Sequence, residues 1–195
     1  MFPRIITKEE ISELPIKRFE GKIILIDQQE DVKPAVQEIV KEKILGVDTE
    51  TKPAFKKGVF HKTALIQIAT ATKVFLFRLN KIGFPEDLAE ILTNPDIAKI
   101  GIADIQDMKE LKQQFMNDTP KFEPQEVIDL NILCKNMGFE NIGAKNLSAM
   151  VLGHNISKRQ QTSNWETLVL SDAQKYYAAT DAWICRAIYL KLLAE

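Results

Sequence analysis

Hydrophobic positions along the chain follow two patterns, short continuous runs and longer segments with helical spacing. Short runs rich in Val, Ile, Leu and Phe predict buried strands, which we expect at residues 22–26, 44–47, 64–69, 74–77, 98–102 and 125–130. Apolar residues three or four positions apart predict helices, which we expect at residues 32–42, 86–92, 105–115 and 171–193, with the remainder after 130 also helical. A capping-box pattern from Thr7 to Glu10 predicts a further short helix that ends before Pro15.

The connections between the predicted strands indicate how the sheet is built. The short link 70–73 predicts that the strands on either side of it form a hairpin. With strand 44–47 they make an antiparallel meander, and the later strands alternate with helices. We therefore expect an α/β domain with a central mixed sheet that contains a three-strand antiparallel meander and is flanked by helices.

Composition limits the classes of function. A chain of 195 residues that is 45% hydrophobic can build one sizeable core. Its 26 basic and 27 acidic residues give a net charge of -1, which excludes a protein held on nucleic acid by its overall charge, so any such contact must be local. Cys134 and Cys185 are too few for a disulfide scaffold, and no apolar stretch approaches the ~18 residues of a membrane span. We expect a cytoplasmic single-domain protein with no membrane partner.

Acidic side chains follow the predicted strand 44–47. Asp48 and Glu50 come directly after it and, because strand residues alternate, project to the same side. Tyr177 and Asp181 are four residues apart in the predicted C-terminal helix, so they also share a face. Acidic groups at the end of a buried strand cost stability unless a cation neutralises them. The pattern therefore indicates a divalent metal pair that acts on phosphodiesters.

Each of these features also has a simpler interpretation. An Asp-x-Glu pair after a strand is more often a solvated loop entry than a catalytic site, and Tyr177 alone is more often a core residue. Asp181 weakens the simpler interpretation, because an acid within an apolar helical stripe needs a partner. Lys158 and Arg159 are usually solvated charges, although either could contact substrate phosphates.

The acidic motifs resemble those of the DEDD superfamily of 3′-5′ exonucleases, and within it the branch shared by ribonuclease D and the exonuclease domain of the Werner syndrome protein. The resemblance covers roughly residues 20–192. Three motifs carry it in the right order, namely Asp48 with Glu50, the strand-to-helix segment Lys99–Asp107, and Tyr177 with Asp181. It implies a ribonuclease H-like (DnaQ-like exonuclease) fold, with residues 1–20 as an N-terminal extension that contains a short helix and residues 21–195 as the exonuclease domain.

The resemblance also implies a two-metal mechanism. Hard Mg²⁺ or Mn²⁺ ions prefer carboxylate oxygens, and the implied ligands are Asp48, Glu50, Asp107 and Asp181. Asp48 would bridge both ions. Glu50 and Asp181 would complete the first site and Asp107 would hold the second, while Tyr177 would orient the nucleophilic water.

Two assignments rest on position. Tyr177 lies about 40° round the helix from Asp181, whereas Tyr176 lies about 140° away, so Tyr177 should face the metals. Tyr176 stands where the sister subfamily has its His, which makes this a tyrosine-type (DEDDy) member. Asp104 competes with Asp107 for the second acidic role, because it could instead be the N-cap of the helix there; the register of the resemblance favours Asp107.

The implied function is 3′-5′ exonucleolytic release of nucleoside 5′-monophosphates, with DNA favoured and a single-stranded 3′ end or a 3′-recessed duplex as the nucleic-acid partner. Lys56, Lys57 and Lys62, in the loop that leaves the acidic strand, are candidate phosphate contacts. The alternatives are ribonuclease D-like trimming of RNA 3′ ends and a catalytically inactive nucleic-acid-binding domain. Nothing in the sequence indicates an oligomeric state.

Overall fold

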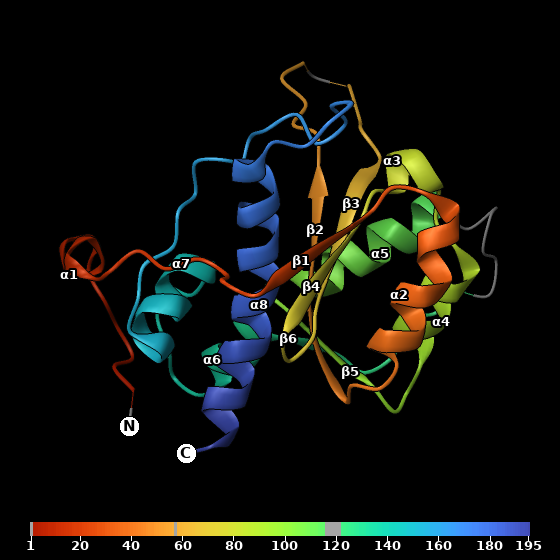
Figure 1. Cartoon of the computed structure of the whole chain (residues 1–195). Helices are drawn as coiled ribbons and strands as arrows, with labels where there is room; N and C mark the ends of the chain where they lie inside the picture. The colour runs from red at the N-terminus through yellow and green to blue at the C-terminus, as the bar shows by residue number, and fades with distance from the viewer. Residues whose placement is uncertain (1, 57, 116–121) are drawn as a thin grey trace.

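A six-stranded sheet lies between two layers of helices in the computed structural model, which describes residues 2–56, 58–115 and 122–195 (Figure 1). The strands are β1 (Lys22–Ile26), β2 (Ile44–Thr51), β3 (Thr63–Ala69), β4 (Lys73–Phe77), β5 (Ala98–Gly101) and β6 (Val127–Asp129). Their order across the sheet is β1-β4-β3-β2-β5-β6. β2, β3 and β4 form an antiparallel meander. The other three pairs are parallel: β1 pairs with β4, β5 pairs with β2, and β6 pairs with β5. The predicted mixed sheet and its meander are confirmed.

Helices α2, α4 and α5 cover one face of the sheet, and α8 covers the other with α6 and α7 beside it (Figure 1). The helices are α1 (Lys8–Glu13), α2 (Val32–Ile39), α3 (Leu79–Ile82), α4 (Glu86–Thr93), α5 (Asp104–Phe115), α6 (Leu130–Asn136), α7 (Ala144–Leu147) and α8 (Asp172–Leu193), with a 3₁₀ turn at Gln29–Asp31 and a π-helical turn at Ser148–Leu152. The capping box predicted for α1 is present. Within the described residues, no helix combines the length and apolar character of a membrane span.

One part of the helix prediction is wrong. Residues 153–171, expected to be helical, form an irregular segment before α8. Gly153, with φ of 71°, ends the preceding turn in the left-handed region. Further along, the buried guanidinium of Arg78 donates hydrogen bonds to the carbonyls of Thr167 and Leu168. Because these carbonyls accept from Arg78, tertiary contacts rather than helical hydrogen bonds satisfy this stretch of backbone.

Successive side chains of β2 point to opposite faces of the sheet, so one set packs in the core and the other faces α8. Leu45 and Val47 point into the core beneath α2 and α4. Gly46, Asp48 and Glu50 occupy the other parity and face α8. The strand continues through Thr51, so the two acids lie inside it rather than after it, where the hydrogen bonds of the meander hold their backbone.

The segment that precedes β1 crosses α8. We call residues 15–20 the N-terminal strap. The amide of Lys17 donates to the carbonyl of Asn155 at 2.9 Å and the amide of Asn155 donates to the carbonyl of Pro15 at 3.0 Å. The amide of Phe19 donates to the buried Thr180 hydroxyl of α8 at 3.0 Å. The strap is therefore tied both to α8 and to the irregular segment before it.

Candidate active site

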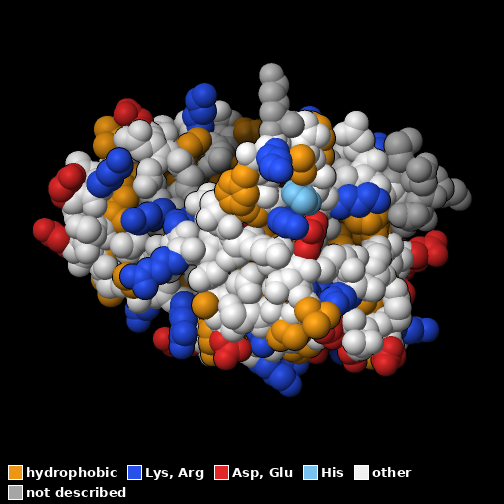
Figure 2. Space-filling model, turned by 90° about the horizontal axis from the view of Figure 1, so that it is seen from above, with side chains coloured by type: hydrophobic (Ala, Val, Ile, Leu, Met, Phe, Trp, Pro, Cys, Tyr) orange, Lys and Arg blue, Asp and Glu red, His pale blue; other side chains and the backbone are white. Residues whose placement is uncertain are grey.

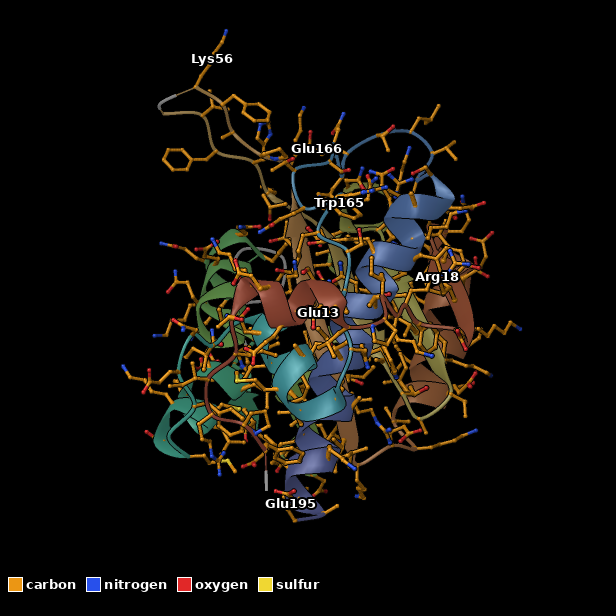
Figure 3. The ribbon with its side chains drawn as sticks, turned by 90° about the vertical axis from the view of Figure 1, so that its left-hand side faces the viewer. Glu13, Arg18, Lys56, Trp165, Glu166 and Glu195 are labelled. Carbon is orange, nitrogen blue, oxygen red and sulfur yellow. The ribbon has the colours of Figure 1, made fainter. Side chains whose placement is uncertain are left out.

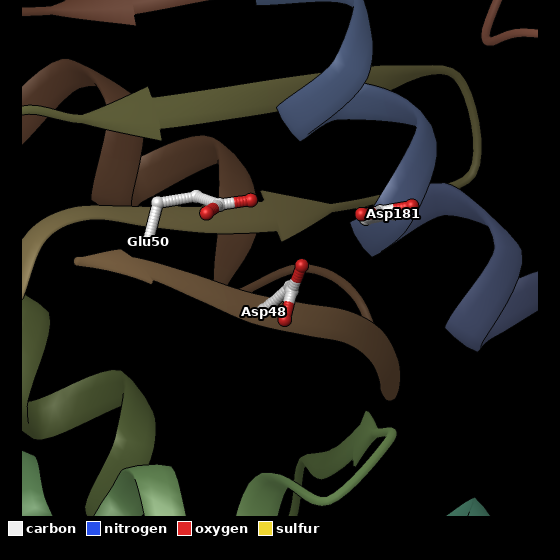
Figure 4. Close-up of side chains that lie close together, drawn as sticks. All are labelled: Asp48, Glu50 and Asp181. Atoms are coloured by element: carbon white, nitrogen blue, oxygen red, sulfur yellow. The ribbon is translucent and has the colours of Figure 1, made fainter. Parts of the chain in front are cut away.

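Three carboxylates from β2 and α8 meet at one point. Asp48, Glu50 and Asp181 each offer an oxygen atom, and these three oxygens all lie within 4.8 Å of one another (Figure 4). Asp48 is half-buried and the other two are buried. A capping box between Ser171 and Gln174 fixes the start of the helix that carries Asp181. This spacing allows the three groups to share one cation.

Gly46 permits the close approach of β2 and α8. A Cβ atom at this position would lie 2.0 Å from the carbonyl oxygen of Ala182 and 3.0 Å from the Cβ of Arg186. Only glycine leaves room for the backbone of α8 at this distance. Ala182 is the neighbour of Asp181, so the missing side chain in β2 is what brings Asp181 to Asp48.

A cavity of about 220 Å³ opens beside the carboxylates. Tyr177 lines it, on the same helix as Asp181. Lys158 and Gln161 line it from the irregular segment. The Lys158 ammonium lies 3.2 Å from Asp181 Oδ2 and 5.5 Å from the centre of the Tyr177 ring. The cavity thus combines a cluster of acids with one phenol and one ammonium group.

Burial and mutual repulsion raise the pKa values of the carboxyl groups. Burial raises the pKa of Asp48 well above its usual range, and the charge of Asp181 raises it further. Burial and the charge of Asp48 raise the pKa of Glu50 to about 10. Burial also raises the pKa of Asp181, although Lys158 acts in the opposite direction. One ammonium does not offset this crowding, and a divalent cation is the partner that such oxygens prefer.

Asp107 lies outside the group of three. It is half-buried on α5, and burial together with the charges of Glu110 and Asp129 raises its pKa to about 6. Its charge also raises the pKa of Asp48, so it acts on the cluster from nearby. Asp104 begins α5, but its side chain lies outside the described part of the structure. The preference for Asp107 over Asp104 stays a prediction.

Two of the three predicted lysines, Lys56 and Lys62, belong to the described residues. Lys56 is exposed at the tip of the loop between β2 and β3 (Figure 3), and Lys62 lies over the ring of Phe115 at 5.6 Å from its centre. Lys57 is outside the described residues. Neither Lys56 nor Lys62 lines the carboxylate cavity, so their contact with phosphates stays a prediction.

Sequence patterns missed three features near the site. Phe55 and Phe60, on the loop between β2 and β3, are 85% and 92% exposed. On the face of the molecule that carries this loop, hydrophobic side chains lie beside Lys and Arg side chains (Figure 2). The direct ion pair of Lys158 is the second feature. The third is Gln67, which pairs with Asp48 across the sheet, is fully buried and has no hydrogen-bond partner for its amide among the described residues. No local pattern marks any of them, because each depends on the tertiary neighbours of the residue.

Known proteins resemble this chain in sequence and in fold. The profile of a family described as "3′-5′ exonuclease" matches residues 23–195. The bifunctional 3′-5′ exonuclease/ATP-dependent helicase WRN of Mus musculus is 30% identical over 188 residues, which cover 92% of this chain and 13% of that protein. The Nibbler EXO domain of Aedes aegypti has a TM-score of 0.79 at 22% identity, over 92% of this chain and 91% of that chain. Ribonuclease D of Escherichia coli, an exoribonuclease involved in structured RNA processing, has a TM-score of 0.74 at 22% identity, over 89% of this chain and 46% of that chain.

The two structural likenesses confirm the predicted ribonuclease H-like fold. The chain spans less than half the length of the mouse protein and of the ribonuclease D chain.

Proposed function

This chain belongs to the 3′-5′ exonuclease family, and we propose that it removes nucleoside 5′-monophosphates from the 3′ end of nucleic acid with two divalent ions, Mg²⁺ or Mn²⁺. The observation that carries the proposal is the meeting of three carboxylates with a tyrosine hydroxyl in one cavity. An all-oxygen donor set fits hard divalent cations and argues against a zinc site built from His or Cys.

In the proposed mechanism Asp48, Glu50 and Asp181 would hold one divalent ion, and Asp107 would hold a second. When bound, the ions would supply an activated water and would neutralise charge on the attacked phosphate and on the leaving oxygen. Tyr177 orients the water through its hydroxyl. Burial and the charge of Asp181 raise the pKa of Tyr177 above its usual value, so the phenol stays protonated at neutral pH and acts as a hydrogen-bonding group rather than as a base.

The loop between β2 and β3 supports an unpaired 3′ end as the substrate. Phe55 and Phe60 present aromatic faces to solvent, and unpaired bases stack on such faces whatever their sequence. Lys56, Lys57 and Lys62 would contact the accompanying phosphates. DNA is the favoured substrate. The likeness to ribonuclease D keeps RNA as the second candidate, because the contacts to a 2′-hydroxyl that separate the two are local.

A gel assay on 5′-labelled oligonucleotides tests this function. Single-stranded, 3′-recessed and blunt DNA and matched RNA would each be incubated with Mn²⁺, Mg²⁺ or EDTA. We expect a ladder that shortens from the 3′ end only with metal, faster on the single strand and the recessed end than on the blunt duplex. A folded protein that binds these oligonucleotides and gives no ladder with either metal would support the inactive binding domain instead.

Metal should stabilise the protein, and more strongly at higher pH. Raised carboxyl pKa values mean that the metal-free native state binds more protons than the unfolded state, so its stability falls as pH rises. For Asp107 the fall lies between pH 3.8 and about 6, and for Glu50 it continues from pH 4.5 to about 10. Mn²⁺ at 100 times its Kd adds about 2.7 kcal/mol, or roughly 5–10 °C in Tm for a chain of this size.

Calorimetry at pH 5.5 and pH 8, with EDTA or Mn²⁺, measures this effect. We expect a lower Tm at pH 8 than at pH 5.5 in EDTA and a larger Mn²⁺ increment at pH 8. Equal Tm values with Mn²⁺ and EDTA at both pH values would contradict the assignment of the carboxylates as a metal site.

A further inference from the structure

A second cavity lies next to the carboxylate cavity. It has a volume of about 370 Å³, and Tyr177 forms part of its wall as well as part of the wall of the carboxylate cavity. We call it the rear pocket. Its other principal lining residues are Lys17, Arg18, Ser157, Arg159, Gln160 and Tyr176.

Residues 157–161 form the partition between the two cavities. Lys158 and Gln161 line the carboxylate cavity, whereas Arg159 and Gln160 line the rear pocket. A nucleic-acid strand that enters one cavity therefore needs to pass only this short segment of the protein to reach the other cavity. The two cavities differ in charge, because three acids dominate the first, while Lys17, Arg18 and Arg159 outnumber Glu20 in the second.

One basic group of the rear pocket, Arg18, is held in place. The Arg18 guanidinium stacks on the ring of Tyr176, with its Cζ atom 3.9 Å from the ring centre. The stacked face leaves the N–H edge of the guanidinium available for a bidentate contact with a phosphate. On either side of Arg18, the amides of Lys17 and Phe19 are bonded to Asn155 and Thr180. The strap therefore fixes the position of Arg18 in advance, which lowers the entropic cost of binding.

The charge balance of the whole chain means that the proposed activity depends on local contacts to phosphate. A net charge of -1 supplies no general attraction to a polyanion, and the carboxylate cavity repels one until metal is bound. Arg18 also lies on the opposite side of the view from Lys56, so it marks a separate face of the molecule (Figure 3). The matched family region begins at residue 23, so the strap adds a feature outside that region.

We propose that the rear pocket binds a backbone phosphate of the substrate strand at a distance from the bond that is cut. The proposal rests on the exonuclease function above and deepens it. Arg18 and Arg159 grip the phosphate, while the 3′-terminal nucleotide occupies the carboxylate cavity across residues 157–161. The N-terminal extension thus becomes part of the nucleic-acid interface.

The test compares Arg18→Gln/Arg159→Gln with the wild type and with Lys135→Gln, which removes one charge from an exposed residue of α6. The value of kcat/KM is measured on a 20-nucleotide single strand from 50 to 200 mM salt, and on p-nitrophenyl thymidine 5′-phosphate, which is too short to span both cavities. We expect about a tenfold loss on the long strand and a salt slope shallower by about 0.7, the change expected when the contact to one phosphate of a single strand is lost. The short substrate and the Lys135 variant should behave as wild type.

Three other outcomes would overturn the proposal in distinguishable ways. An unchanged salt slope with full activity on the long strand would show that the pocket makes no contact with it. Equal losses on both substrates would indicate damage to the carboxylate site. Weaker inhibition by added thymidine 5′-monophosphate, with an unchanged slope, would show that the pocket takes the released product instead. If the wild type cuts neither substrate, the exonuclease function itself fails, and anisotropy of a labelled strand in EDTA still compares binding by the variant and the wild type.

Discussion

Replacing Asp48 with asparagine should lower kcat by about a thousandfold or more, which corresponds to ~4 kcal/mol in activation free energy, while the protein stays folded. The amide side chain would keep the shape of the carboxylate but lose the charge that attracts a metal ion. Burial and the charge of Asp181 already raise the pKa of Asp48 in the metal-free protein. Removing the charge should therefore leave the metal-free Tm unchanged or higher. The measurement pairs the gel assay with thermal unfolding in EDTA and in Mn²⁺.

The matched control is Asp96→Asn, the same chemical change at an exposed turn. It should keep wild-type kcat and the full Mn²⁺ increment in Tm, whereas Asp48→Asn should lose most of both. Near-normal turnover in the Asp48 variant, with Mg²⁺ present, would remove Asp48 from the proposed site.

Gly46→Ala should have the largest effect on stability. The added Cβ would lie 2.0 Å from the carbonyl oxygen of Ala182, and this atom is backbone in the middle of α8, so it cannot turn aside. Overpacking of this kind costs about 1–3 kcal/mol, and more where the backbone must move; we expect ~3 kcal/mol or above. Because relief requires α8 to move away from β2, Asp181 should also leave Asp48, and activity should fall with stability.

Gly138→Ala is the control that distinguishes the steric clash at position 46 from the effect of replacing any glycine by alanine. Gly138 has φ of 82°, and no atom of the described residues lies within 4 Å of the position of a Cβ, so alanine there costs only backbone strain of about 1–2 kcal/mol. Chemical denaturation should rank Gly46→Ala as the more destabilised variant, and only that variant should lose Mn²⁺ binding. An equal or smaller cost at position 46 would mean that β2 and α8 can separate without strain.

The parts of the site that residue spacing predicted are those governed by a local period. A two-residue repeat put Asp48 and Glu50 on one face of a strand, and a four-residue spacing put Tyr177 and Asp181 on one face of a helix. The structure brings these four residues to one cavity. The order of strands similarly predicted the meander, because a short link leaves few ways to connect two strands.

The features that spacing did not predict depend on contacts between distant segments. Apart from Gly153, the irregular path of residues 153–171 is set by distant contacts, because Arg78 and the strap satisfy part of their backbone. Lys158 looked like an ordinary solvated charge until the fold placed it beside Asp181. The closeness of Asp107 to the other acids likewise depends on how α5 packs, which no local pattern encodes.

The path of the chain through the site has a consequence for biosynthesis. Asp48 and Glu50 belong to an early strand, whereas Asp181 and Tyr177 belong to α8, and α8 is packed against β2, β3 and β4. A nascent chain that has emerged only as far as the sheet has two of the acids but neither the helix nor the partner of the strap at Thr180. Domains fold as units once their contacts are complete. The cluster of three carboxylates is therefore incomplete in the nascent chain until residues 172–193 have left the ribosome.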